Sequence, residues 1–520
     1  MRPFIHQTLH QLRPEQLPRS GAVILLFAIV LPIALTVVGL VIDGGLMMAE
    51  HRRLQYVADA AATTAASEIN RRSTSAVATT AAVDCVRVQN LLNDASVTVE
   101  IPPASGQFMG RSGYVAVNVE RNYRTSFIRI ISGAGSRPVR IRSVAGTENA
   151  TQGVALALLD PQPTPITVTG LPLGLGTLAL PQLQVGALEL LGLGRMKVNG
   201  AVVVNANWGR VDESNKPTGH SNLPPYGISC TPILPLTKLA ATDIRVSGGV
   251  DQPGNYGHST AGKPSPLVAN RMPMVDPFKD LPVPTVNSDS KNVYSNVRGG
   301  RTIVALPAVA PIVNNLLPIV QLPPILDMTV VLEPGIYDWI EVVSGPVRFQ
   351  PGVYIIRGKN PLTGIPLSII GGQITAEGVL FYITESASYS SSSGGSDASE
   401  GETTPPPLNQ TTLLPSAVVN LALLGSKYSG LNDPSSPFHG MLFYQQRHSR
   451  KPMIFVAEQL LGGVSLTGTI YAKWGQVIFA ANGTYDLKIA AGTARFVNVL
   501  ELNLSPTSLF PPARDVFLVQ

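Results

Sequence analysis

Charge is scarce in this sequence, because Asp, Glu, Lys and Arg together make up only 14% of its 520 residues. The net charge of +5 is spread thinly, and no run of Lys or Arg exceeds two residues. Nucleic-acid-binding domains concentrate basic residues on one face, often beside aromatic residues that stack on bases. Such a patch is missing, so a nucleic-acid partner is not expected.

Cysteine is nearly absent as well: Cys85 and Cys230 are the only two, and neither belongs to a CxxC motif. A structural zinc site is therefore not expected. In an oxidising compartment two cysteines are able to pair, but their spacing in the sequence does not show whether they do. A disulfide and two separate buried thiols both remain open at this stage.

Catalytic motifs are also missing. The seven histidines form no HxH or HExxH pattern, and there is no P-loop and no GxSxG before a predicted helix. The acidic residues that a hydrolase or lyase would need are scattered: Asp243, Asp251, Asp276, Asp280, Asp338 and Glu341. We interpret the best-spaced two, Asp338 and Glu341, as solvated residues at the edge of a coil of the chain. The sequence therefore predicts a protein that is not an enzyme, with no catalytic, cofactor-binding or metal-binding residues and no small-molecule substrate.

What the sequence does contain is a long apolar run near its start. Residues Ala22 to Ile42 carry no charge, and only Thr36 and Gly39 interrupt the apolar side chains. A helix of these 21 residues spans about 31 Å, enough to cross a hydrocarbon core about 30 Å thick. Pro32 is compatible, since membrane helices tolerate proline. A cleaved signal peptide is the alternative, but the run is long for one and no small-x-small cleavage pattern follows it.

The apolar run leads without a clear stop into a stretch that favours helix, in which apolar residues recur mostly every three or four positions. We predict a cytoplasmic tip at residues 1–20, a transmembrane helix at 21–42 and a stalk helix at 43–75. Arginines are more numerous before the run than shortly after it: Arg2, Arg13 and Arg19 against Arg52 and Arg53. This favours a single-pass inner-membrane protein with a cytoplasmic N-terminus and the bulk of the chain in the periplasm.

The membrane segment and the stalk follow the pattern GAV…FAxxLP…G…D and then RRLQxxADAAA. This pattern resembles the N-terminus of the TadE/TadG-like family of Flp (tight adherence) pilus-assembly proteins. The resemblance covers about a tenth of the chain, through Gly21, Ala22, Val23, Phe27, Ala28, Pro32, Gly39, Asp43, Arg53, Leu54, Gln55, Ala58, Asp59, Ala60 and Ala61. Some TadG-like proteins also carry a von Willebrand A domain, whose DxSxS loop binds a cation, but this sequence has no DxSxS.

The resemblance implies a non-enzymatic, membrane-anchored component of tight-adherence pilus assembly or of a related envelope complex. Its partners would be the inner membrane and other pilus-assembly or envelope proteins. A processed pseudopilin is a further hypothesis, but pseudopilins carry Glu five residues after the cleaved glycine, where this sequence has Leu26. Processing by a prepilin peptidase is therefore not expected.

Residues 76–150 contain three segments in which apolar and polar residues alternate: Ser96 to Ile101, Tyr114 to Glu120 and Pro138 to Ala145. Alternation with a period of two is typical of half-buried strands. We therefore predict a small α+β unit in which the stalk alanines pack against a sheet. The plan is similar to that of pilin-like proteins.

From residue 151 to 384, short β-prone runs alternate with Gly, Pro and Asn turns. The pentapeptide Glu333 to Tyr337 (EPGIY) recurs as Gln350 to Tyr354 (QPGVY), a step of 17 residues. Each Pro-Gly pair is typical of a type II turn. Repeated strand-turn units favour a solenoid, and a parallel β-helix in particular, with a β-sandwich as the alternative. The fold class expected is thus α+β and membrane-anchored, with a mainly-β ectodomain.

The rest of the chain fits this plan. Residues 385–412 are polar and of low complexity, which predicts a mobile loop, and 413–520 are expected to form the last coils, with 506–520 as a cap. The proline-rich segment 275–284 is expected to cross the solenoid. Two apolar blocks, 171–194 and 303–332, hold too many prolines and polar residues to be membrane spans.

Parallel β-helices include many polysaccharide lyases and hydrolases, so a membrane-tethered polysaccharide-binding or -cleaving protein is the alternative function. Aromatic residues aligned on successive coils would stack on sugars. The candidates for such a ladder are Tyr337, Trp339, Tyr354, Tyr382 and Tyr471. Interior packing is the competing interpretation of the same residues.

Overall fold

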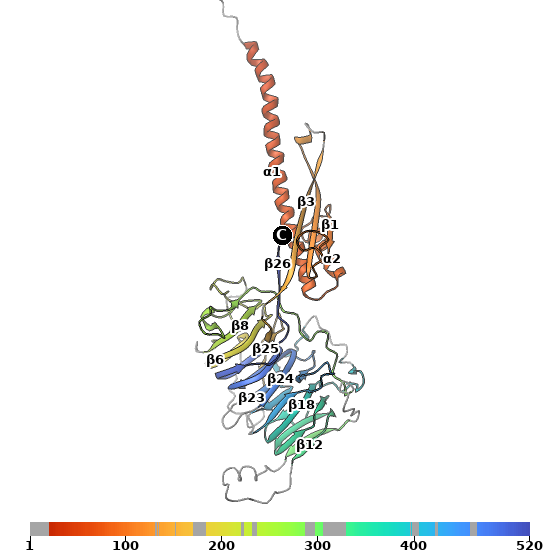
Figure 1. Cartoon of the computed structure of the whole chain (residues 1–520), viewed down its shortest axis with the longest axis vertical. Helices are drawn as coiled ribbons and strands as arrows, with labels where there is room; N and C mark the ends of the chain where they lie inside the picture. The colour runs from red at the N-terminus through yellow and green to blue at the C-terminus, as the bar shows by residue number, and fades with distance from the viewer. Residues whose placement is uncertain are drawn as a thin grey trace, which may run out of the picture. The chain divides into compact units, whose positions relative to one another are not determined.

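The structure is a computed structural model of the chain, which divides into two compact units (Figure 1). The first comprises Met1–Thr147 together with Val516–Gln520, and the second comprises Glu148–Asp515. The residues that the structure describes are 20–129, 133, 135–150, 152–169, 184–219, 223–230, 237–286, 297–304, 329–395, 397, 405–421, 425–457 and 465–519.

A single helix, α1 (Ser20–Asn70), takes up the predicted membrane segment and stalk. Its 51 residues continue through Pro32 without a break, which corresponds to a length of about 77 Å. The helix ends before residue 75, because Thr74 begins a second helix, α2 (Ser75–Asp84), by accepting a hydrogen bond from the backbone N–H of Val77. A π-helical turn, Cys85–Gln89, follows.

The sheet of the first unit has the order β1-β2-β3-β26. Strands β1 (Ser96–Glu100), β2 (Tyr114–Arg124) and β3 (Ser136–Asn149) pair in antiparallel fashion. The three alternating segments identified in the sequence are therefore confirmed as strands.

The fourth strand, β26 (Arg514–Leu518), comes from the far end of the chain. The sequence-based expectation of a cap on the last coils at 506–520 was wrong for this strand. Just beyond it, the backbone N–H of Val519 donates to the carbonyl of Val144 at 2.9 Å, and Val516 packs against the core of the first unit. The edge of β3 that does not face β2 has backbone N–H and C=O groups to pair, and β26 supplies a strand for them.

The core of the first unit lies between α1 and this sheet. The buried face of the helix consists mainly of alanines, which allow the backbone to approach the sheet closely. The cluster includes Leu54, Val57, Ala58, Ala61, Ala62, Ala65 and Ala66 of α1 and Val115, Val117, Val119, Val139 and Ile141 of the sheet. The expectation that the stalk alanines pack on the strands is confirmed.

The second unit is built around a 20-stranded sheet whose ladders are parallel throughout the described residues. The strands before residue 270 are β4 (Val154–Leu158), β6 (Gly186–Val204), β7 (Tyr226–Ser229), β8 (Lys238–Val246), β9 (Tyr256–His258) and β10 (Leu267–Val268). The next are β11 (Gly300–Val304), β12 (Val330–Leu332), β13 (Gly335–Tyr337), β14 (Trp339–Ser344), β15 (Pro346–Phe349), β16 (Gly352–Ile356), β17 (Leu367–Ile369) and β18 (Gln373–Ile383). The last are β20 (Ala417–Asn420), β21 (Lys427–Gly430), β22 (Met441–Gln445), β23 (Met453–Ala457), β24 (Ser465–Ala481) and β25 (Gly483–Leu504). Outside this sheet, β5 (Thr167–Val168) pairs with β19 (Thr412–Leu413).

Most ladders join a strand to the strand about three places further along the chain. Thus β11 pairs with β14, β14 with β17, β17 with β20 and β20 with β23. A second series runs from β12 through β15 to β18, and a third from β13 through β16 to β18. Each winding of the chain therefore lays its strands beside those of the winding before it.

The chain enters this stack in the middle and not at an end. Strand β25 pairs with β24 on one side and with both β4 and β6 on the other, so the last strand of the second unit lies beside its first. Figure 1 shows β25 next to β6 and β24. The windings from β4 to β10 extend one way from this junction, and those from β25 back to β11 extend the other way. No periodicity in the sequence indicated this arrangement.

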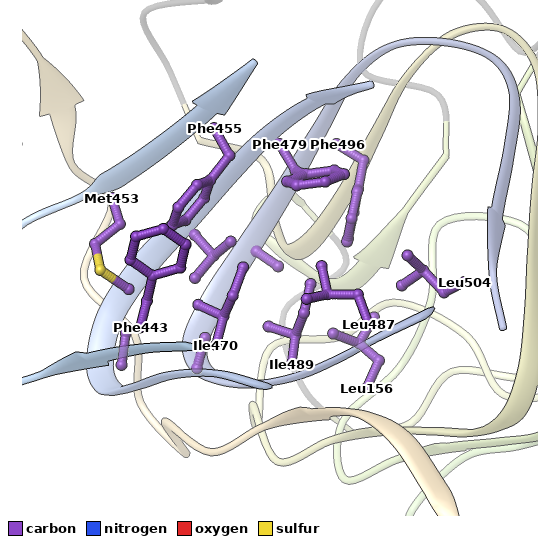
Figure 2. Packing of buried hydrophobic residues seen from close by; sticks show 14 of the residues in the cluster. Leu156, Phe443, Met453, Phe455, Ile470, Phe479, Leu487, Ile489, Phe496 and Leu504 are labelled. Atoms are coloured by element: carbon purple, nitrogen blue, oxygen red, sulfur yellow. The ribbon is translucent and has the colours of Figure 1, made fainter. Parts of the chain in front are cut away.

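Equivalent apolar side chains stack along the inside of the windings. Phe443 is the register partner of Ile470, Ile470 of Ile489, and Ile489 of Leu156. A parallel row places Phe455 beside Phe479 and Phe479 beside Phe496. Figure 2 shows both rows converging on one continuous core. Burial of this area is the main stabilising contribution to the unit.

The Pro-Gly repeat belongs to this stacking, but in a different register. Gly335 lies opposite Tyr354, so the ladder offset is 19 residues and not the 17 of the sequence repeat. Gly335 and Gly352 have φ of +146° and +141°, far from the value of about +80° in a type II turn. Only glycine adopts such angles easily, and the same conformation recurs at Gly200 and Gly468.

The proline-rich segment runs across several windings, as expected. Met274 exchanges hydrogen bonds with the side chain of Asn205, just after β6, and Phe278 and Leu281 accept from the guanidinium of Arg447, just after β22. Further along, the carbonyl of Pro284 accepts from the hydroxyl of Tyr389 at 2.8 Å.

The predicted mobile loop at 385–412 is only partly within the described residues, which omit 396 and 398–404. Tyr389 and Asp397 inside it are buried, and Asp397 accepts hydrogen bonds from Tyr382 and Gln446 at 2.9 Å. A few specific contacts thus order a segment whose composition is polar. Most of the two apolar blocks, 171–183 and 305–328, lies outside the described residues.

Candidate functional site: the motif face of the first helix

Three residues of the sequence pattern, Gly39, Asp43 and Asp59, lie on the face of α1 that packs against the β2–β3 hairpin. Gly39 is the first of them. A Cβ at this position would lie 2.5 Å from the ring of Phe127, which follows β2. No real Cβ contact is that short, so glycine is what allows the hairpin to touch the helix here.

Asp43, one helical turn further, fixes the same end of the hairpin. Its side chain is buried, and its two carboxylate oxygens accept hydrogen bonds from three consecutive backbone N–H groups: Ser126 at 3.2 Å, Phe127 at 2.7 Å and Ile128 at 2.7 Å. Charge-assisted hydrogen bonds of this kind are among the strongest in proteins. The sequence singled out Asp43 as a motif residue but gave no sign of this partner more than eighty residues away.

Further along α1, an ion-pair network links the helix to the sheet. The guanidinium of Arg121 in β2 donates to Glu50 of α1 at 2.6 Å and to Asp94 at 2.9 Å. The hydrogen bond from Arg121 lowers the pKa of the Asp94 carboxyl. This network was not expected from the sequence, because its three residues lie in different segments of the chain.

Two further motif residues act together near the base of the sheet. The carboxylate of Asp59 accepts a hydrogen bond from Gln55 at 2.7 Å and another from the hydroxyl of Ser143 in β3, also at 2.7 Å. Gly39, Asp43 and Asp59 therefore hold α1 against the hairpin and the sheet at three positions along the helix. Packing on the sheet therefore accounts for these three residues of the motif.

The apolar run itself has almost no cover. The large hydrophobic side chains from Ile24 to Ile42 are 45–69% exposed, and α1 is long and apolar enough to cross a membrane. Burying such a surface requires lipid or another protein.

The acidic residues named in the sequence analysis are not brought together. Asp338 accepts from Arg357 at 2.9 Å, and Glu341 accepts from Thr302 and Asn360, so each is held by its own partners. Asp243 pairs with Arg245, Asp251 accepts from the backbone of Cys230, and Asp276 accepts from Tyr471. Among the described residues, no group of three or more His, Cys, Asp or Glu side chains is placed to hold a metal ion.

The aromatic residues considered for sugar stacking are interior. Tyr337, Tyr354, Tyr382 and Tyr471 are at most 1% exposed. Trp339 is half-buried, and its indole N–H donates to Thr302 at 3.3 Å. The ladder Tyr382, Tyr444, Tyr471 exists in the register, but Phe278 of the crossing segment packs edge-on against Tyr471 at its end. A solvent-facing sugar platform is therefore not formed by these residues.

The two cysteines are free and buried, and they belong to different units. Burial raises the pKa of the Cys230 thiol well above its ordinary value, which keeps the thiol protonated. We expect neither cysteine to react with a maleimide in the folded protein and both to react in urea, as mass spectrometry of the labelled chain will show. A disulfide in the untreated protein, or rapid labelling of either residue, would contradict this.

We expect Glu100 to make the first unit sensitive to acid. A hydrogen bond from the backbone of Ala104, helped by Asn118 and Arg142, lowers the pKa of its carboxyl below the usual 4.5. Because the folded pKa lies below the unfolded one, Glu100 stabilises the unit above about pH 4.5, and this contribution is lost as the pH falls through the lowered pKa. Pulse proteolysis in urea should show this loss in the wild type, and Glu100→Gln should reduce the pH dependence. The exposed Asp84→Asn serves as control; equal acid sensitivity of Glu100→Gln and the wild type would refute the assignment.

Comparison with known proteins assigns the motif. In the part of the chain that the structure describes, a mainly β fold is combined with one helix long and apolar enough to cross a membrane. Residues 21–68 match a family model described as putative Flp pilus-assembly TadE/G-like. The matched segment lies within α1 and contains Gly39, Asp43 and Asp59, so the resemblance predicted from the sequence is confirmed. No curated protein and no solved structure is significantly similar to the chain.

Proposed function

We propose that this protein is a single-pass inner-membrane component that helps to assemble a Flp (tight-adherence) pilus or a related envelope complex, without catalysing a reaction. The observation that carries the proposal is that the segment matched by the pilus-assembly family model is also the helix with an exposed apolar surface of membrane length. The arginines before the run favour a cytoplasmic N-terminus and a periplasmic ectodomain.

We further propose that the second unit is a parallel β-helix. Three observations support this: parallel ladders between successive windings, interior rows of apolar residues in register, and the same glycine conformation on several windings. A rigid stack of this kind offers loops and strand edges to other envelope proteins. The role would be geometric: α1 fixes the position at the membrane, and the two units present surfaces to partners.

The absence of a catalytic role is part of the proposal. It is supported by the way the best-spaced acidic residues, Asp338 and Glu341, are each held by other side chains. The polysaccharide-binding alternative gains nothing from the aromatic residues, because those aligned between windings are buried.

The experiment is a gene deletion complemented with variants of the full chain, with surface pili counted by electron microscopy and membrane association measured by carbonate extraction. The double variant Leu31→Arg and Leu35→Arg places two charges near the middle of the apolar run, each of which costs about 2.5–3.5 kcal/mol in a bilayer. We expect it to lose membrane retention and to fail to restore pili. The matched control Met109→Arg, at an exposed apolar residue outside the helix, should restore both. Normal pili in the deletion strain would show that the pilus role is wrong.

A further inference from the structure

The β2–β3 hairpin ends beside α1 at the level where the apolar run stops. We propose that this hairpin tip, residues Arg124 to Arg129 with Arg137, is a second membrane-contacting element that lies on the bilayer surface and binds anionic lipid headgroups. The inference rests on the proposed insertion of α1 and concerns a separate part of the first unit.

Two of the contacts described above determine where the tip lies along α1. Phe127 lies on Gly39, and the backbone of residues 126–128 is hydrogen-bonded to Asp43. The apolar run ends at Ile42, so Gly39 lies about 5 Å inside that end along the helix axis. If α1 spans a bilayer, the hairpin tip is held at the boundary between hydrocarbon and headgroups.

The side chains of the tip suit that boundary. Phe127 is 39% exposed although it is a large hydrophobic residue. Phenylalanine is among the apolar residues that elements lying on a bilayer bury at the boundary between headgroups and acyl chains. The ring of Phe127 lies against Gly39 of the apolar run, whose large side chains are exposed as well.

Arginines flank Phe127 along the chain and on the opposite strand of the hairpin, and they differ from the arginines further along the hairpin. Arg121, Arg140 and Arg142 pair with acidic residues: Glu50 and Asp94, Glu120, and Glu100. Arg124, Arg129 and Arg137 are exposed, and none of them forms an ion pair with a described residue. Guanidinium groups bind phosphate through paired hydrogen bonds, and anionic leaflets attract basic residues close to the surface. Unneutralised arginines therefore gather where phosphate headgroups would lie.

The test uses the full chain with one introduced cysteine at a time, reconstituted in vesicles of phosphatidylcholine and phosphatidylglycerol. The native cysteines are buried, so a fluorescent maleimide reports the new site. Ser126→Cys places the label at the tip, Met109→Cys places it on an exposed loop before β2, and Val37→Cys places it on the apolar run. Quenching by nitroxide-bearing lipid is compared with quenching by aqueous iodide.

We expect lipid quenching at positions 37 and 126 and iodide quenching at position 109. Omitting phosphatidylglycerol should lower the ratio of lipid to aqueous quenching at the tip. Combining Ser126→Cys with Arg124→Gln and Arg129→Gln should lower the same ratio about fivefold per arginine removed. The charge-matched control pair Arg87→Gln and Arg111→Gln should leave it unchanged.

Each other outcome has a definite meaning. A lipid-exposed label at position 37 with a water-exposed label at 126 overturns the tip proposal and leaves the anchor intact. A water-exposed label at position 37 contradicts the anchor itself. A label at 126 that is shielded from both quenchers means that protein covers the tip, which also overturns lipid binding.

Discussion

Replacing Glu189 with leucine is expected to destabilise the second unit by about 3–5 kcal/mol, because it leaves the buried guanidinium of Arg495 without its carboxylate. Both side chains are at most 2% exposed. Glu189 accepts a hydrogen bond from Arg495 and others from the backbone of Val185 and Gly186. Burial raises the pKa of the Glu189 carboxyl even with Arg495 beside it, so desolvation is the larger influence at this site.

The position of the pair makes the effect large. Glu189 in β6 and Arg495 in β25 are register partners at the junction where the last winding of the unit meets an early one. An uncompensated charge at this place is expected to weaken the contact between β6 and β25, where the two halves of the stack meet, in addition to its local cost.

Urea unfolding followed by tryptophan fluorescence will measure this change, because Trp208, Trp339 and Trp474 are the only tryptophans and all lie in the second unit. Glu501→Leu is the matched control: it removes an exposed glutamate from β25 and should change the stability by less than about 0.5 kcal/mol. The double variant Glu189→Leu and Arg495→Met should recover most of the loss, since replacing a whole buried pair is often neutral. A stable single variant would show that the charge is solvated in the protein.

Replacing Asp43 with alanine is expected to release the hairpin tip from α1. Three neighbouring backbone donors would lose their acceptor together, and an unsatisfied donor away from water is costly. Hydrogen exchange measured by mass spectrometry should show protection of the amides at 126–128 falling roughly tenfold or more. Protection in the distant strand β1 should be retained.

Two further variants serve as controls for this prediction. Asp43→Asn keeps one acceptor oxygen and should lose less protection than Asp43→Ala. Asp84→Ala removes an exposed carboxylate from the neighbouring helix α2 and should leave the tip unchanged. Unaltered exchange at 126–128 in Asp43→Ala would mean that Phe127 packing on Gly39 alone holds the hairpin.

The local elements were readable from the sequence, since their signals are local. A period of two marked the strands of the first unit, and a long uncharged run marked the apolar part of α1. The resemblance at residues 21–68 pointed to the family through spacing on a single helix. The glycine repeat indicated stacked strands, although the true register differs from the repeat by two residues.

What the sequence by itself determined is the long N-terminal helix, the three extended segments of the first unit and the apolar face of each. Tertiary structure alone decided which segments meet: β26 with β3, β25 with β6, Asp43 with the hairpin tip and Glu189 with Arg495. The physical reason is that periodicity reports how a side chain points from its own backbone. The choice of partner depends on shape and charge brought together from distant parts of the chain, for which a single sequence holds no local signal.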